Sequence, residues 1–255
     1  MILSSGTKKP KIHSSAYVAA GATISGDVEI GPGCAILHGA VLVAEGAPLR
    51  VGAETVVMEN AVVKASGGSV IAFPCTIGKH CIVGPHAYVV GATIGNGCFI
   101  ASGASIFNGA TLGDDSGVAL GAIVHVGTRI AKGASVPMQH IAHGDPATIY
   151  PPDRAAEVHA KMNFYSDVFN QEPGADVRAR AAESYTRFLR KMHAQDSRLD
   201  DHRTDKPAPR RSLSTDEPPA TQSADVGGVV DAMMLELAEL EHRRQEALKK
   251  QKGSK

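Results

Sequence analysis

One apolar residue recurs at every sixth position over most of residues 16–136, and a small residue follows each one four positions later. Between residues 76 and 136 the apolar heads are Ile77, Val83, Val89, Ile94, Ile100, Ile106, Leu112, Val118, Val124, Ile130 and Val136, with one interval of five. A helix would need apolar residues three and four apart, and a half-buried strand would need strict alternation. A fixed period of six predicts a parallel β-helix instead.

The period fixes the geometry of the predicted coils. Six residues form one side of a triangular coil, so about 18 residues form a turn that stacks on the next at roughly 4.8 Å. The apolar head fills the interior, and the small residue fits near a corner where a larger side chain would meet the next coil. We therefore expect an all-β solenoid with C-terminal α-helices, in which residues 16–150 form a left-handed parallel β-helix.

Two interruptions of the hexads predict loops. The register breaks at residues 44–50, before Val51, and again at residues 65–70, before Ile71 as the next head. Residues 1–15 precede the first hexad and are predicted to be an N-terminal lead-in. Loops on a solenoid carry most of its variable chemistry, because the coils themselves are committed to stacking.

The period of six ends after Val136, and residues 151–194 predict helices. Residues 155–162 are helix-like, residues 170–174 contain turn-forming residues, and Asp176 is a plausible N-cap for a second helix. The second helix has one apolar face at helical spacing, made by Val177, Ala181, Tyr185, Phe188 and Met192. We expect that face to lie on the prism or on a neighbouring subunit.

The last 61 residues have a different composition. Residues 195–226 are rich in charge, proline and serine and contain few large apolar side chains, which predicts a disordered linker. Residues 227–255 follow a short heptad-like pattern through Val230, Met233, Leu237 and Leu240. This pattern fits either a solvated helix or a helix that docks on a partner.

Charge and cysteine content exclude several classes of function. The chain has 26 basic and 26 acidic residues, so its net charge gives no reason to expect nucleic acid or an anionic membrane as a partner. No apolar run resembles a signal peptide or a membrane span, which predicts a cytoplasmic location. Cys34, Cys75, Cys81 and Cys98 all occupy small positions of hexads and are expected to be buried space-fillers.

Particular segments make the chain resemble the γ-class carbonic anhydrase family. The segments are KIHSSAYVAAGATISGDVEIGPGC, the loop AVLVAEG, the coils around IVGPHAYVVGATIGNGC and the turn GDPAT. The resemblance covers roughly residues 10–170. It implies a left-handed β-helix that forms a trimer, with zinc held between subunits by three histidines and used to hydrate carbon dioxide.

The family's site residues are replaced at the matching positions of this chain. The three zinc-ligand positions fall on Lys64, Pro85 and Val90, none of which is a histidine. The family's Arg-Ser-Asp loop falls on residues 42–44, and its Gln-Asp pair falls on Met58 and Glu59. Glu45 matches the family's proton shuttle, but it has no zinc-bound water to serve. The resemblance therefore predicts no zinc and no other cofactor.

Three functions remain open from the sequence. The first is a structural or partner-binding homotrimer, similar to the metal-free pointed-end subunits of dynactin, with the C-terminal tail as a tether for a protein partner. The second is a hexapeptide acyltransferase that uses acetyl-CoA, with His86 or His125 as general base. The third is a relocated metal site around His86 with His38 or His125, or around His140 and His143. We adopt the first interpretation, a structural or partner-binding homotrimer.

Overall fold

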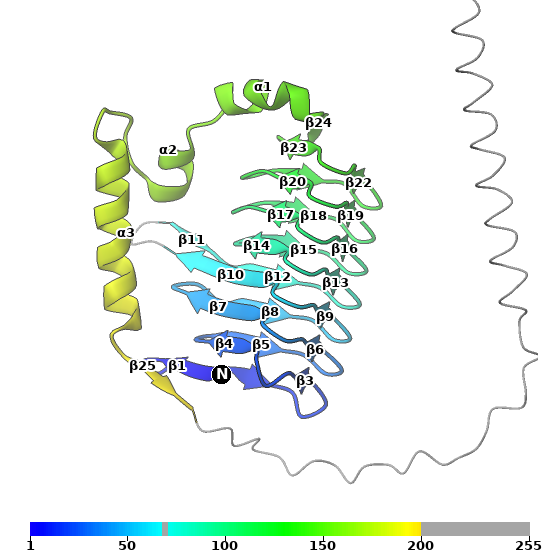
Figure 1. Ribbon diagram of the computed structural model, residues 1–255, viewed down its shortest axis with the longest axis vertical. Helices are drawn as coiled ribbons and strands as arrows, with labels where there is room; N and C mark the ends of the chain where they lie inside the picture. The colour runs from blue at the N-terminus through cyan, green and yellow to red at the C-terminus, as the bar shows by residue number, and fades with distance from the viewer. Residues whose placement is uncertain (68–70, 200–255) are drawn as a thin grey trace, which may run out of the picture. The chain divides into compact units, whose positions relative to one another are not determined.

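The computed structural model describes residues 1–67 and 71–199. Their short strands form a β-solenoid of about eight turns, followed by a few helices (Figure 1). Most neighbouring strands come from successive coils and pair in parallel. This is the arrangement that a six-residue period requires, and the predicted fold class is confirmed.

Three sheets run along the solenoid. Sheet 1 has 11 strands, which are β24 (Thr148–Tyr150), β23 (Ile141–His143), β20 (Ile123–Val124), β17 (Ser105–Ile106), β14 (Tyr88–Val90), β10 (Val62–Gly67), β7 (Val41–Glu45), β4 (Thr23–Ser25), β1 (Ile2–Ser5), β25 (Asp196–Arg198) and, paired with β10, β11 (Ala72–Phe73). Sheet 2 consists of β2 (Lys11–Ile12), β5 (Val28–Ile30), β8 (Leu49–Val51), β12 (Cys75–Ile77), β15 (Thr93–Ile94), β18 (Thr111–Leu112) and β21 (Arg129–Ile130). Sheet 3 consists of β22 (Ser135–Val136), β19 (Gly117–Val118), β16 (Phe99–Ile100), β13 (Ile82–Val83), β9 (Val56–Val57), β6 (Ala35–Ile36) and β3 (Tyr17–Val18).

The core lies inside the prism and is made by the residues that the hexads predict. Heads such as Ile24 and Ile36 are fully buried, and the residues four positions later, Val28 and Ala40, are buried as well. The four cysteines are free and buried, as expected from their small positions. Burial raises the pKa of the Cys75 thiol to about 12, so this thiol is unreactive packing material.

A column of glycines lets the coils approach one another along sheet 2. It consists of Gly31, Gly52, Gly78, Gly95 and Gly113, each following the head of its coil. A Cβ on any one of them would lie 2.5 to 2.9 Å from backbone atoms of the next coil. In the last strand of the sheet, the equivalent residue is Ala131, where no further strand of sheet 2 follows.

The helices follow β24 and return along sheet 1. A short 3₁₀ turn, η1 (Pro152–Arg154), leads into α1 (Ala155–Ala160), α2 (Phe164–Phe169) and α3 (Val177–His193). Figure 1 shows α3 running along the stack of coils beside sheet 1. On the apolar face of α3, the Tyr185 hydroxyl accepts a hydrogen bond from Lys64, and Phe188 lies beside Gly46.

The structure differs from the sequence-based boundaries in several places. Strands β1 and β2 lie within the predicted lead-in, and both pair in parallel with strands of the next coil. Strand β25 lies within the segment predicted as a linker from residue 195, because residues 196–198 pair with β1. Ile71 is not an interior head but is half-buried outside the core, because the chain turns back through β11 at this point. Helix α2 was not predicted.

Two other predictions concern the C-terminal part. The rest of the predicted linker to residue 226, and the predicted terminal helix at 227–255, lie outside the described residues. Among the helices within residues 1–199, none has the length and apolar character needed to cross a membrane.

Candidate functional site

An ion pair on sheet 1 joins the two strands that are longest in the solenoid. Strands β7 and β10 pair in register, with Lys64 opposite Val43 and Ser66 opposite Glu45. Lys64 is therefore diagonal to Glu45, which long side chains can bridge. The Lys64 Nζ lies 2.6 Å from the Glu45 Oε2, and both side chains are largely buried.

Helix α3 covers this ion pair with a tyrosine and a histidine. The Tyr185 hydroxyl accepts a hydrogen bond from the Lys64 Nζ at 3.0 Å and donates one to the Glu45 Oε2 at 3.2 Å. Two turns later, the His193 Nε2 lies 3.7 Å from the Glu45 Oε1. The His193 Nδ1 lies 2.6 Å from the Asp196 Oδ2 at the start of β25. Glu45 thus connects the prism to α3 at two points, Tyr185 and His193.

The network keeps Lys64 charged and Tyr185 neutral. Burial alone would lower the pKa of Lys64, but its hydrogen bonds to Glu45 and Tyr185 and the charge of Glu45 raise that pKa above its ordinary value. Burial raises the pKa of Tyr185, while the nearby Lys64 opposes the rise. Lys64 is therefore an ammonium ion at neutral pH and is not available as a nucleophile or a metal ligand.

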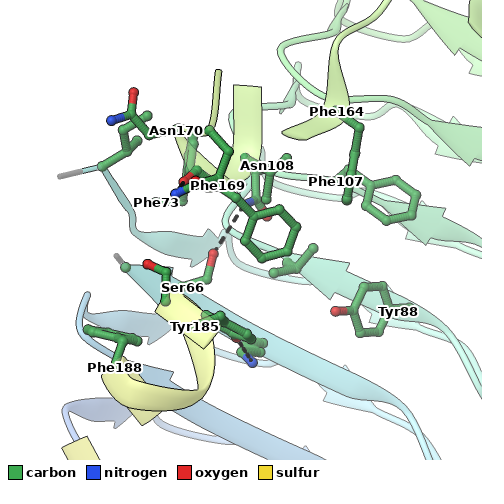
Figure 2. Close-up of a pocket in the computed structure, with 17 residues that line it drawn as sticks. Ser66, Phe73, Tyr88, Phe107, Asn108, Phe164, Phe169, Asn170, Tyr185 and Phe188 are labelled. Atoms are coloured by element: carbon green, nitrogen blue, oxygen red, sulfur yellow. Dashed lines mark hydrogen bonds between the residues drawn. The ribbon is translucent and has the colours of Figure 1, made fainter. Parts of the chain in front are cut away.

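A pocket of about 350 Å³ lies beside the ion pair, between sheet 1 and helices α2 and α3 (Figure 2). From the prism side it is lined by the rings of Phe73, Tyr88 and Phe107, and from the helix side by those of Phe164, Phe169, Tyr185 and Phe188. Lys64, Ser66, Asn108, Asn170, Gln171 and Ser184 supply its polar groups. Asn108 is buried and donates a hydrogen bond to the Ser66 hydroxyl at 3.2 Å.

Next to the pocket, outward residues of successive coils form an aromatic ladder along sheet 1. The Phe107 and His125 rings are stacked with centroids 5.6 Å apart, and His125 meets His143 edge-on at 6.0 Å. Burial and the neighbouring His143 lower the pKa of His125, and Asp167 on α2 opposes this. The His143 Nδ1 is buried without a hydrogen-bond partner. His125 therefore favours the neutral form.

The candidates from the sequence separate into two groups. Glu45, Lys64 and Val90 come together, since Val90 is buried opposite Lys64 on the next coil. Pro85 and His86 lie at a corner between β13 and β14, where His86 is exposed with a φ of 57°. His38 is exposed at the corner of another coil, and the His140 Nδ1–H donates a hydrogen bond to the Met138 carbonyl oxygen.

The three positions that the resemblance assigns to zinc do not fit that metal. Proline and valine side chains have no donor atom, and the Lys64 ammonium is held by Glu45 and Tyr185. Within residues 1–67 and 71–199, no three histidine, cysteine, aspartate or glutamate side chains are grouped so that they could hold a metal ion. No catalytic step through zinc can be derived from these residues.

Sequence reasoning missed Tyr185 as a partner of the ion pair and missed the pocket. The ion pair itself had a signal in the sequence. The segments VLVAEG (residues 41–46) and VVKASG (residues 62–67) lie on neighbouring coils and align without a gap. That alignment places a lysine diagonal to a glutamate on the outer face. The identity of the covering residues was not readable, because it depends on how α3 returns along the prism.

No protein-family model matches the sequence. Gamma carbonic anhydrase 1, mitochondrial, from Arabidopsis thaliana is 28% identical over 192 residues, which is 73% of this chain and 68% of that protein. Gamma carbonic anhydrase 2, mitochondrial, from the same plant is 32% identical over 130 residues, which is 49% of this chain. The match covers 46% of that second protein, so this chain spans less than half of its length.

Solved structures with related repeats were also found. A hexapeptide transferase family protein from Anaplasma phagocytophilum has a TM-score of 0.48 and 21% identity, over 76% of this chain and 98% of that one. Perosamine N-acetyltransferase from Caulobacter crescentus has a TM-score of 0.34 and 25% identity, over 52% of this chain and 57% of that one. The sequence matches show that this chain is similar to γ-carbonic anhydrases, and the three-sided stack of hexads shows a hexapeptide-repeat β-solenoid.

Proposed function

We propose that this chain is a non-catalytic member of the γ-carbonic-anhydrase-like proteins, in which the zinc ligands are replaced and the solenoid acts as a partner-binding trimer. One observation carries the proposal. At the first of the inferred zinc positions, the Lys64 ammonium lies 2.6 Å from Glu45. A fixed positive charge takes the place of a metal ligand, so the carboxylate that would serve a metal-bound water is neutralised by protein instead.

The arrangement of Glu45 supports a structural role. The Glu45 carboxylate is not free. It forms an ion pair with Lys64 of the prism, accepts a hydrogen bond from Tyr185 of α3 and lies near His193 of α3. Its side chain is largely buried, so it has little contact with water. A proton shuttle needs access to solvent and a changing protonation state, and these contacts favour a fixed anion that anchors the helix.

An exposed apolar ladder on sheet 3 supports a binding role. Tyr17, Ile82 and Phe99 occupy equivalent outward positions of their coils, with Ala35 and Val56 between them in the register. The three large side chains are 51%, 41% and 51% exposed in the single chain. Rows of apolar side chains on one face are typical of interfaces between subunits or with partners. A trimer, which the family resemblance implies, would use such a face.

Metal analysis of the full chain tests the proposal. We expect protein purified without chelators to contain far less than one zinc per chain, and to leave carbon dioxide hydration at the uncatalysed rate. A matched relative with three histidines serves as the positive control. Stoichiometric zinc that is lost in His125→Ala or His86→Ala would overturn the proposal and favour a relocated metal site.

The location of the protein stays a prediction. The sequence predicts a cytoplasmic protein, whereas the two Arabidopsis relatives carry the word mitochondrial in their names. A fluorescent fusion of the full chain, compared with markers of both compartments, distinguishes the two.

A further inference from the structure

We propose that the pocket between sheet 1 and helices α2 and α3 is a binding site for a small, neutral, planar aromatic molecule that carries a carbonyl or amide oxygen. The inference concerns a ligand site and does not depend on whether the protein is catalytic. Four features of the pocket support it: its size, its aromatic walls, its charge balance and the spare donor of Lys64.

The size and the walls fit a ring system of one or two fused rings. A volume of about 350 Å³ lies near the lower end of the roughly 300–1,000 Å³ usual for ligand pockets, which are mostly apolar with a few polar groups. Rings line the pocket on both sides (Figure 2). Phe169 meets Tyr185 at 5.6 Å and 73°, and Tyr185 is stacked with Phe188 at 6.2 Å and 17°. Such walls offer both faces and edges to a flat ligand.

The charge balance selects a neutral ligand. Lys64 is the one charged residue among the described residues that line the pocket. Its charge is matched by Glu45 at 2.6 Å, so the pair is neutral as a unit. A carboxylate or an ammonium group on a ligand would lose its hydration without gaining an unpaired counter-charge, which disfavours both.

Lys64 provides a donor for the polar end of the ligand. An ammonium group has three N–H donors, and Lys64 uses one on Glu45 and one on Tyr185. Because Lys64 also lines the pocket, the third N–H is the natural partner for a carbonyl oxygen. Asn108 uses one of its two amide N–H groups on Ser66, so its second N–H is an uncharged donor that a ligand oxygen could also meet.

Three naphthalene probes test the chemistry on the full-length protein by isothermal titration and ligand-observed NMR. The probes are 2-naphthamide, 2-naphthoate and naphthalen-2-ylmethanamine, which share the ring system and differ in the charge of the substituent. We expect saturable one-site binding of the amide, with affinity at least about tenfold higher than that of either charged probe. Equal or stronger binding of a charged probe overturns the assigned ligand class.

A filling substitution tests the location. Ser184 on α3 lines the pocket one helical turn from Phe188, so Ser184→Trp should fill it and weaken 2-naphthamide binding at least tenfold. Thr186→Trp is the matched control, because Thr186 is exposed on the same helix and does not line the pocket. Both variants must keep the thermal unfolding transition. Unchanged binding in Ser184→Trp, or equal loss in both variants, overturns the location.

A paired substitution tests the polar contact. The double variant Lys64→Met with Glu45→Gln removes the donor and its counter-ion together, so no buried charge is left unpaired. We expect the wild type to bind 2-naphthamide about tenfold more tightly than naphthalene, and the double variant to lose that preference. A preference that persists overturns the role of Lys64. No binding of any probe to folded protein, or a second copy's side chain in the pocket, overturns the whole inference.

Discussion

At the scale of single residues, Glu45 is the centre of one connected group of polar side chains. Glu45 is only 9% exposed, yet it has contacts with Lys64, Tyr185 and His193. The group joins a strand of the prism to a helix more than a hundred residues later in the chain. The pKa of Lys64 and that of Tyr185 are both raised, which keeps the lysine charged and the tyrosine neutral.

Removing one member of the ion pair should destabilise the protein more than removing both. Lys64→Met leaves the Glu45 carboxylate buried without its counter-ion, and we expect a loss of about 2–3 kcal/mol in the free energy of unfolding, below the roughly 3–5 kcal/mol typical of fully buried pairs. Lys64→Met with Glu45→Gln should recover most of that loss. Urea denaturation measures both. A double variant less stable than the single one would contradict the neutralisation argument.

Acid should weaken the fold through His125. The folded pKa of His125 is lowered by burial and by His143, so the unfolded chain binds the proton more readily. The contribution is fully present above the ordinary histidine pKa of about 6.5 and is lost as pH falls through the folded pKa. We expect His125→Phe to reduce the fall in melting temperature between pH 7.5 and 5. Exposed His86→Phe is the control, and an equal effect there would exclude His125 as the source.

Only part of the candidate site could be predicted from the sequence. The sequence placed Lys64, Pro85 and Val90 at the inferred zinc positions, and the structure brings Lys64 and Val90 together on neighbouring coils while Pro85 lies at a corner. The pairing of Lys64 with Glu45 follows from register and was within reach. The contact with Tyr185 depends on tertiary packing, which local periodicity does not encode.

At the scale of elements, the solenoid was the most predictable part. Each hexad specifies one side of a coil, so the burial of heads and small residues follows from the period alone. Prediction failed where the period stops. Ile71 was assigned as a head by counting, whereas in the structure Cys75 is the residue paired with Leu49 inside the prism. The hairpin formed by β10 and β11 shifts the register of the hexads, and the six-residue pattern gives no sign of this hairpin.

The glycine column of sheet 2 gives an element-level prediction. A Cβ at Gly78 would lie 2.5 Å from the Gly95 carbonyl oxygen, so Gly78→Ala must push two coils apart. We expect it to cost about 1–3 kcal/mol, in the range of overpacked cores. Denaturant unfolding measures it.

The end of the column provides the control. Ala131 occupies the equivalent position in the last strand of sheet 2, so Ala131→Gly removes a methyl group that meets no further coil of that sheet. Its effect should be about 1 kcal/mol or less, from backbone freedom. Comparable losses for Gly78→Ala and Ala131→Gly would show that spacing between coils does not set the requirement.

At the scale of the whole molecule, two of the three outer faces of the prism differ from each other. Sheet 1 is partly covered by α2 and α3, while sheet 3 presents the ladder of Tyr17, Ile82 and Phe99. The sequence did not indicate which outward residues share a face, because assigning a face requires the loops to be placed correctly first.

The exposed ladder gives a test of self-association. If copies of the chain meet through sheet 3, Ile82→Asp with Phe99→Asp should shift the sedimentation coefficient from a trimer to a monomer, because a carboxylate buried at an apolar interface is strongly unfavourable. Leu120→Asp changes an equally exposed apolar residue at a turn outside sheet 3 and should leave the coefficient unchanged. A trimer that survives the double substitution would place the contact on another face.

The pairing of β1 with β25 has a consequence for synthesis. Leu3 lies opposite Arg198, so the two strands are made about 195 residues apart. At the roughly 5–20 residues per second of a ribosome, the interval is about 10–40 s. During this time one edge of the nascent first strand stays open to other extended chains. Translation speed, or a chaperone that shields this edge, should therefore influence the yield of correctly folded protein.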